Sequence, residues 1–105
     1  MIVNIFYMRP RYFRDLSLGD VPPKLGELHI THAYLKTIEV ACVEDAFARM
    51  QGEVWSPNGE ARDLIEACGL SHTSMSVGDV VQDVDAKQYY VCASVGFTQL
   101  VAECK

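Results

Sequence analysis

Two β-rich runs in the C-terminal third of the chain constrain its fold most strongly. The runs "VGDVVQDV" (77–84) and "QYYVCASVGF" (88–97) are dominated by β-branched and aromatic residues. The polar segment "DVDAKQ" separates them and has the length of a hairpin connection. Together they predict an antiparallel β-hairpin.

Four other segments have recognisable patterns. Residues 2–8, "IVNIFYM", predict a strand that ends at an Arg-Pro step. Residues 31–40 alternate as a strand does, although their apolar residues do not sort to one side. Residues 43–53 and 60–68 repeat apolar side chains at helical spacing.

The two predicted helices have defined inner faces and ends. In the first, Val43, Phe47 and Met50 recur on one side, and Gly52 is expected to end the helix. Gly69 is expected to end the second. The inner stripe of the second helix is expected to be Ala61, Leu64, Ile65 and Cys68.

The connections complete the predicted architecture. Residues 9–29 are punctuated by proline and glycine, which predicts a long loop or a short helical insertion. Residues 98–104, "TQLVAEC", could add a last short strand. This order predicts one α+β domain over residues 1–105, with a mostly antiparallel sheet of about four to five strands and two short helices.

The charge distribution limits the possible partners. Residues 1–36 carry five Lys or Arg against three Asp or Glu, a balance of +2, whereas residues 37–105 carry four against eleven, a balance of −7. A protein that coats nucleic acid needs many cations to neutralise phosphates, and the acidic body does not supply them. Such a body favours basic partners.

Neither a metal nor a cofactor is expected. The cysteines (Cys42, Cys68, Cys92 and Cys104) are irregularly spaced among apolar neighbours, which favours buried thiols over a zinc or redox site. His29 and His32 would point to opposite faces of a strand.

No membrane partner is expected either. The chain has no apolar run near the roughly 20 residues that span a bilayer, and its first residues lack the features of a signal peptide. We therefore expect a cytoplasmic protein.

The segment "HTSMSVGD" (72–79) holds the residue types of a nucleophilic site. His72, Ser74, Ser76 and Asp79 could serve a hydrolase or transferase. However, no G-x-S-x-G pattern is present, and one glycine without a lysine does not make a phosphate loop. We therefore assign no catalytic residue and interpret the segment as an extended lead-in with a tight turn or bulge at Gly78-Asp79, before a buried strand that starts at Val80.

The segment "RPRYFRD" is the best candidate for binding a partner. Arg9, Arg11, Tyr12, Phe13 and Arg14 are the residue types that dominate interface hot spots and that stack on bases. In the alternative interpretation the two aromatic side chains pack inward and the arginines stay in water.

The chain resembles the small YodL-like proteins and domains found on phages, plasmids and conjugative elements. These share a helix, a turn containing Trp and Asn, the string "R-S-x-S-V-G-D-V-V", an acidic link and an aromatic strand ending in "G-F". The resemblance covers about residues 43–100. The matching residues are Phe47, Trp55, Asn58, Ser74, Ser76, Val77, Gly78, Asp79, Val80, Tyr90, Gly96 and Phe97.

One departure from the family concerns the residue before the first serine. The family often has a basic residue there, whereas this chain has Thr73, with His72 beside it. Any partner contact that the basic residue makes in the family is therefore in doubt here.

The resemblance implies an accessory protein of mobile elements and no known enzymatic activity. We therefore expect a non-catalytic protein-interaction module, either an inhibitor of a host defence system or a conjugation accessory factor. The alternative is a small nucleic-acid-binding domain. Its phosphate contacts and stacking would come from Arg9, Arg11, Arg14, Tyr34, Tyr89 and Tyr90.

Overall fold

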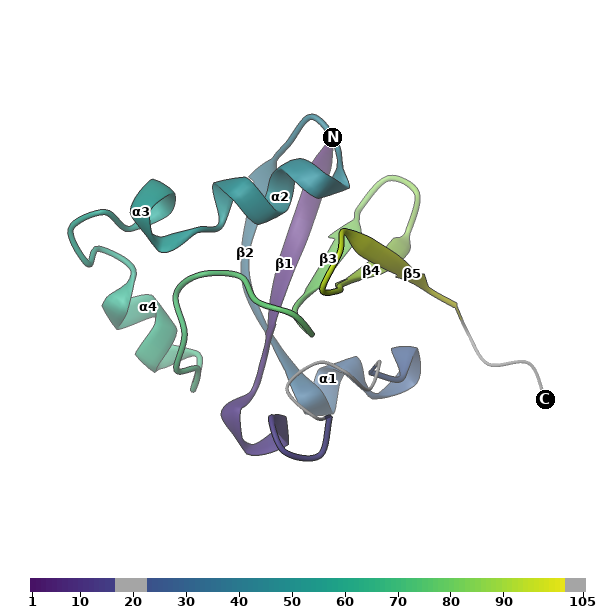
Figure 1. The fold of residues 1–105 in the computed structure, drawn as a ribbon, viewed down its shortest axis with the longest axis horizontal. Coiled ribbons are helices and arrows are strands. Elements are labelled where there is room, and N and C mark those ends of the chain that lie inside the picture. The colour runs from purple at the N-terminus through teal and green to yellow at the C-terminus, as the bar shows by residue number, and fades with distance from the viewer. Residues whose placement is uncertain (17–22, 102–105) are drawn as a thin grey trace.

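A five-stranded antiparallel sheet, with strands in the order β2-β1-β3-β4-β5, forms the centre of the molecule (Figure 1). The computed structural model describes residues 1–16 and 23–101. The strands are β1 (Ile2–Met8), β2 (His32–Glu39), β3 (Val80–Asp83), β4 (Gln88–Cys92) and β5 (Phe97–Leu100). The helices are α1 (Leu28–Thr31), α2 (Val43–Arg49), α3 (Gly52–Trp55) and α4 (Arg62–Ala67), with 3₁₀ turns η1 (Pro10–Tyr12) and η3 (Leu25–Glu27). The predicted α+β class is confirmed.

The N-terminal strand β1 lies inside the sheet, between β2 and β3. It is apolar on both faces, as a strand covered from two sides must be. Val3, Ile5 and Tyr7 have no exposed surface on one face, and Phe6 packs into a second core on the other. The first strand of the chain thus becomes the centre of the fold.

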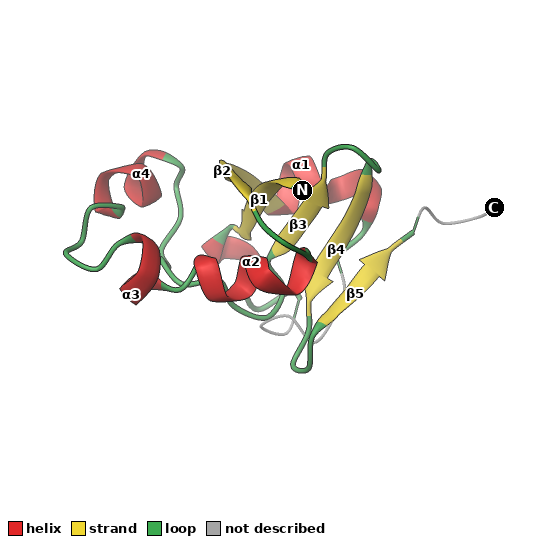
Figure 2. Cartoon of the chain, turned by 90° about the horizontal axis from the view of Figure 1, so that it is seen from above, coloured by secondary structure: helices red, strands yellow, loops and turns green. Residues whose placement is uncertain are grey.

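Each face of the sheet has its own hydrophobic core. Figure 2 shows α2 and α1 on opposite sides of the strands. The larger core, on the α2 side, includes Val3, Ile5, Tyr7, Leu35, Val43, Ala46, Met50, Ile65, Met75 and Val81. The smaller core, on the α1 side, consists of Leu28, Val80 and Val91, with Phe6, Leu25, Tyr89 and Leu100 packed against it.

A β-bulge in β2 explains why its apolar residues do not alternate simply. The ladder between β1 and β2 shifts register after Ile5, and Leu35 is the extra residue. The bulge moves the alternation by one position, so that Ala33, Leu35 and Ile38 all contact the larger core. A regular strand would have turned Ile38 to the other face.

The helical region departs from prediction at α2 and α3. Gly52, predicted to end the first helix, instead begins α3 after α2 has ended at Arg49. A Cβ at Gly52 would lie 3.1 Å from Oγ of Ser74, so this glycine permits a close approach of two segments. Phe47, predicted to face inward, is 41% exposed, and Ala46 takes the buried position.

The second predicted helix is confirmed as α4, although it is shorter than residues 60–68. Gly69 ends it in the left-handed conformation, with φ of 71°. Ala61 and Ile65 are buried as predicted, but Leu64 is exposed, because this short helix packs through one narrow stripe.

The β-rich run 88–97 is a strand only as far as Cys92, and the short strand predicted from residue 98 is present as β5, which begins at Phe97. β4 ends at Cys92, and a turn with Gly96 at φ of 69° leads into β5. Sequence pattern alone missed this break because small residues at 93–96 have no strong turn signature. Residues 102–104 of the predicted last strand lie outside the described residues.

The predicted loop at 9–29 contains the turns η1 and η3, and α1 begins at its end, at Leu28, and continues to Thr31. Residues 17–22 of this loop lie outside the described part of the chain. The prediction of a short helical insertion is therefore partly met, and β2 starts at His32.

Candidate functional site

The carboxylate of Asp79 is the centre of a buried polar cluster where β1, the 71–79 loop and β3 meet. Asp79 is 1% exposed. Its Oδ1 accepts the backbone N–H of Met8 at 2.8 Å, and Oδ2 accepts that of Ser76 at 2.8 Å. Nε2 of His72 donates to the same Oδ2 at 2.8 Å. A carboxylate can be buried only with such partners. We refer to Tyr7, His32, His72, Gly78 and Asp79 as the polar corner.

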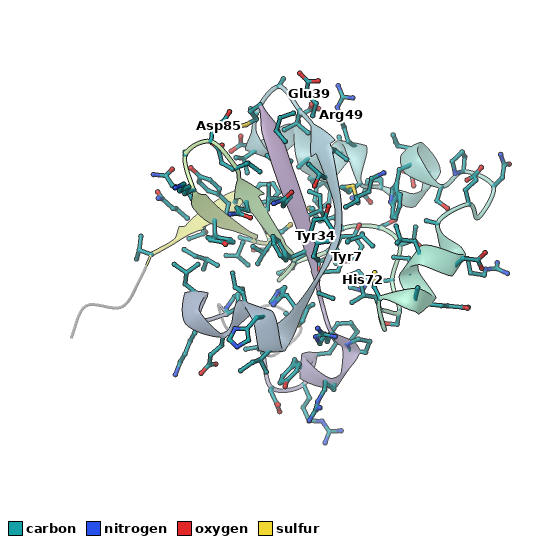
Figure 3. All side chains as sticks on the ribbon, turned by 180° about the vertical axis from the view of Figure 1, so that it is seen from behind. Tyr7, Tyr34, Glu39, Arg49, His72 and Asp85 are labelled. Atoms are coloured by element: carbon teal, nitrogen blue, oxygen red, sulfur yellow. The ribbon has the colours of Figure 1, made fainter. Side chains whose placement is uncertain are left out.

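His72 is held by two aromatic rings as well as by Asp79. Its ring stacks on Tyr7, with centroids 4.5 Å apart and planes at 12°, and the ring of Phe13 meets it at 5.7 Å (Figure 3). The second ring nitrogen, Nδ1, is buried without a hydrogen-bond partner among the described residues. A Ser-His-Asp site would place its nucleophile on that nitrogen. Here no hydroxyl from the described chain is aligned with it.

The two serines of the 72–79 segment bond to the main chain. Oγ of Ser74 accepts the N–H of Gly52 at 2.7 Å, which joins the loop to the start of α3. Oγ of Ser76 donates to the carbonyl of Ser74 at 3.2 Å. The structure therefore brings His72 and Asp79 together, and it uses both hydroxyls to shape the loop that carries them.

His32 contributes a second imidazole to the polar corner. Its Nε2 donates to the carbonyl of Gly78 at 2.7 Å, and its Nδ1 lies 2.7 Å from Oγ1 of Thr31. Burial lowers the pKa of His32, and the Gly78 carbonyl and Asp79 oppose this effect in part. Gly78 has φ of 97°, a conformation that requires glycine and that turns its carbonyl toward His32.

Tyr7 and Trp55 fasten the loop to the sheet from the α2 side. The Tyr7 hydroxyl donates to the carbonyl of Thr73 at 2.7 Å, and the indole N–H of Trp55 donates to the same oxygen at 3.0 Å. Burial, assisted by the charge of Asp79, raises the pKa of the Tyr7 phenol, so the hydroxyl keeps its proton. Tyr7 and His32 each bond to a residue far away in the sequence, Thr73 and Gly78. The sequence therefore did not identify Tyr7 or His32 as residues of this site.

A pocket of about 360 Å³ opens beside the polar corner. Its apolar walls come from Met8, Phe13 and Val77, and its polar residues are His72, Ser76 and Asp79. Figure 3 places Glu39, Arg49 and Asp85 at the other end of the sheet from His72. The pocket thus combines apolar walls with a few polar groups, as ligand sites commonly do.

One residue of the predicted binding segment, Phe13, lines this pocket. Arg11 and Arg14 are exposed, whereas Tyr12 and Phe13 are half-buried. The guanidinium of Arg11 lies over the ring of Tyr12 at 5.2 Å, and the backbone N–H of Arg9 donates to Thr31. Phe13 therefore packs inward against His72, while Arg11 and Arg14 are accessible to a partner.

The three tyrosines proposed to stack on bases do not share a face. Tyr34 and Tyr89 lie on the α1 side, on either side of Phe6, at centroid distances of 5.9 and 6.2 Å. Tyr90 packs against the larger core on the opposite face. Phe6, Tyr34 and Tyr89 thus form one aromatic row on the α1 side, and Tyr90 is not part of it.

The residues that carry the family resemblance fall into separate places. Ser74, Ser76, Gly78 and Asp79 form the loop of the polar corner, and Trp55 is bonded to it. Asn58 lies in the exposed turn before α4, where its backbone N–H contacts the carboxylate of Glu60. Gly96 and Phe97 are at the turn between β4 and β5.

Metal-binding side chains do not gather in the described residues. No three of His, Cys, Asp or Glu there converge as ligands of an ion. Cys42, Cys68 and Cys92 are free thiols, and Cys104 lies outside the described range. Burial and the charge of Asp79 raise the pKa of the Cys92 thiol to about 11, which makes it unreactive at neutral pH.

Comparison of the chain with known protein families, curated proteins and solved structures found no match. Among the described residues, no helix has both the length and the apolar character to span a membrane. The function is therefore inferred from the geometry of the site, and the YodL-like resemblance stays a separate hypothesis.

Proposed function

We propose that this chain is a non-catalytic, cytoplasmic module that binds a protein partner at the pocket beside Asp79. The supporting observation is that Phe13, a wall of the pocket, lies between exposed Arg11 and Arg14 in the sequence. Arginine beside a desolvated aromatic anchor is a common composition of binding hot spots. The partner segment would insert an apolar side chain and present carboxylates to the two arginines.

The engagement of the serine hydroxyls supports a role without a nucleophile. Ser74 and Ser76 bond to the backbone, and no described hydroxyl lies on the second nitrogen of His72. By the YodL-like resemblance, the module belongs to a mobile genetic element. It would act there as an inhibitor of a host defence system or as a conjugation accessory factor.

A charge-reversal experiment tests this proposal. The wild-type chain, the Arg11→Glu/Arg14→Glu double variant and an Arg62→Glu control are immobilised and exposed to bacterial lysate. Each retained protein is then purified, and its affinity for all three chains is measured. Arg62 is an exposed arginine of α4 that does not line this pocket. We expect the double variant to bind at least about tenfold more weakly than the control.

Two results would refute the proposal. One is that no purified protein binds saturably to the wild-type chain. The other is that the double variant and the control bind equally well. Turnover of a substrate that Ser74→Ala or Ser76→Ala abolishes would instead establish an enzyme.

The aromatic row on the α1 side favours nucleic-acid binding as a second candidate. Tyr34 is half exposed beside Phe6, and Arg9 lines the same 430 Å³ pocket as both rings. Single-stranded nucleic acid binds to such rows by stacking its bases, with cations along the backbone. Titration of a labelled single-stranded oligonucleotide at several salt concentrations tests this. Binding that weakens steeply with salt would support it, and no binding at low salt would exclude it.

A further inference from the structure

The outer edge of β5 has backbone groups with no partner among the described residues. Cys92 donates its N–H to Asp79 and accepts the N–H of Gly78 on its carbonyl, so both of its backbone groups face β3. Phe97 is opposite Cys92 in the ladder between β4 and β5. Because an antiparallel ladder alternates, the backbone groups of Phe97, Gln99 and Val101 point away from β4. Figure 2 shows no described strand or helix on that side.

Three of the features that normally prevent edge pairing are missing from β5, although the strand is short, at four residues. Natural edge strands carry charged residues, proline or a bulge that discourage another strand. Residues 88–102 include no Asp, Glu, Lys, Arg or Pro, and the register from Phe97 to Leu100 is regular. Two apolar side chains near this edge are largely in water, with Val95 90% and Val101 71% exposed.

The edge is complementary to itself in one register. In an antiparallel pair around a two-fold axis, residues that face each other must lie on the same side of the sheet. Centring the axis on Gln99 sets Phe97 opposite Val101 of the second copy and Thr98 opposite its Leu100. The same register lets the outward N–H and C=O groups of the two Gln99 residues bond to each other. No charge faces a like charge along this strand pair.

We propose that two copies of this chain associate through β5, in an antiparallel pair centred on Gln99, to form a continuous ten-stranded sheet. The interaction is independent of the proposed function, because no residue of β5 lines the pocket beside Asp79. The contact is small, so the dimer is weak and depends on concentration. Each copy carries a net charge of −5. Dimerisation therefore strengthens as salt screens the two bodies from each other.

The experiment uses opposite charges at the two-fold axis. Sedimentation equilibrium is measured for the wild-type chain, Gln99→Lys, Gln99→Glu and an equimolar mixture of these two variants, over a roughly hundredfold concentration range. Gln88→Lys is the matched control, since Gln88 is an exposed glutamine on β4, which pairs with the inner side of β5 and not with its outer edge. Circular dichroism and thermal unfolding establish that every variant is folded.

We expect the wild type and Gln88→Lys to dimerise. Each Gln99 variant alone should dimerise at least about tenfold more weakly, because like charges then face each other across the axis. The equimolar mixture should dimerise again, because a Gln99→Lys chain can pair with a Gln99→Glu chain. A wild-type chain that stays monomeric throughout would overturn the proposal. So would a dimer that tolerates both Gln99 variants, or a mixture that fails to recover.

Discussion

The loop that carries Asp79 in the polar corner and the β5 edge lie at the two ends of one β-rich segment, and they are built in opposite ways. At the corner, Asp79 is almost fully buried and accepts three hydrogen bonds, one from β1 and two from the 72–79 loop. At the edge, Thr98 and Gln99 are exposed, and one side of the strand has no described neighbour.

This difference indicates different roles for two halves of the same segment. A buried network has one satisfied arrangement, and removal of any partner leaves a polar group without solvent, so the corner specifies the fold. An exposed edge contributes little to folding, and its composition is free to serve association. Mutations should therefore act on stability at the corner and on assembly at β5.

The largest effect on stability is expected at Asp79. Asp79→Ala leaves the buried N–H of Met8 and the imidazole of His72 without their acceptor. We expect the free energy of unfolding to fall by about 3–5 kcal/mol. Denaturant unfolding measures this. Asp79→Asn keeps the shape and one acceptor oxygen, so its loss should be smaller.

The control for this prediction is Asp85→Ala, which removes an exposed carboxylate from the turn between β3 and β4. It should change stability by less than about 0.5 kcal/mol. Equal losses for Asp79→Ala and Asp85→Ala would show that the corner does not hold the fold.

A smaller effect is expected from the protonation of His32. Burial lowers its pKa in the folded chain, whereas the unfolded chain binds this proton near pH 6.5. Below that pH the unfolded state therefore binds more protons, and stability falls as pH decreases, by at most about 1.4 kcal/mol per pH unit from this group. Above it, the contribution of neutral His32 is complete.

Unfolding experiments between neutral and mildly acidic pH, with NMR titration of the His32 ring, check this prediction. His32→Gln can keep a hydrogen bond to the Gly78 carbonyl but does not titrate, so its stability should depend less on pH. An unchanged pH dependence in that variant, or a ring that titrates above its usual pKa, would contradict it.

The smallest effect on stability is expected at the edge. Gln99→Lys changes an exposed side chain and breaks no hydrogen bond that the structure shows, so the free energy of unfolding should change by less than about 0.5 kcal/mol. Thermal unfolding at a concentration where the chain is monomeric measures this. A large loss would mean that β5 is part of the cooperative core, and it would remove the contrast between the two regions.

Local pattern predicted much of the fold. The run 2–8 matches β1 to the residue, and the polar link after residue 83 is a hairpin turn, because strand periodicity and turn residues act over short distances. Prediction failed where tertiary packing decided. Leu35 is the extra residue of a β-bulge, which lets Ala33, Leu35 and Ile38 all contact the larger core. Gly52 permits the close approach of Ser74.

The candidate site was predictable only in part. The sequence drew attention to His72 and Asp79 and to Phe13, but it could not pair them, since Phe13 reaches His72 from a distant segment. Tyr7 had no local signature, and His32 was considered only beside His29, as a metal ligand. Their partners lie 66 and 46 residues away along the chain, and only the sheet order brings them together.

The sequence by itself determined the α+β class, the strands and turns, the acidic body and the arginine-rich segment, because these depend on composition and on neighbouring residues. Only the tertiary structure decided that the segment 72–79 is a buried corner and that β5 is an open edge. Both depend on which strand lies beside which. That order follows from the packing of two cores on the two faces of β1, and no short stretch of the chain contains it.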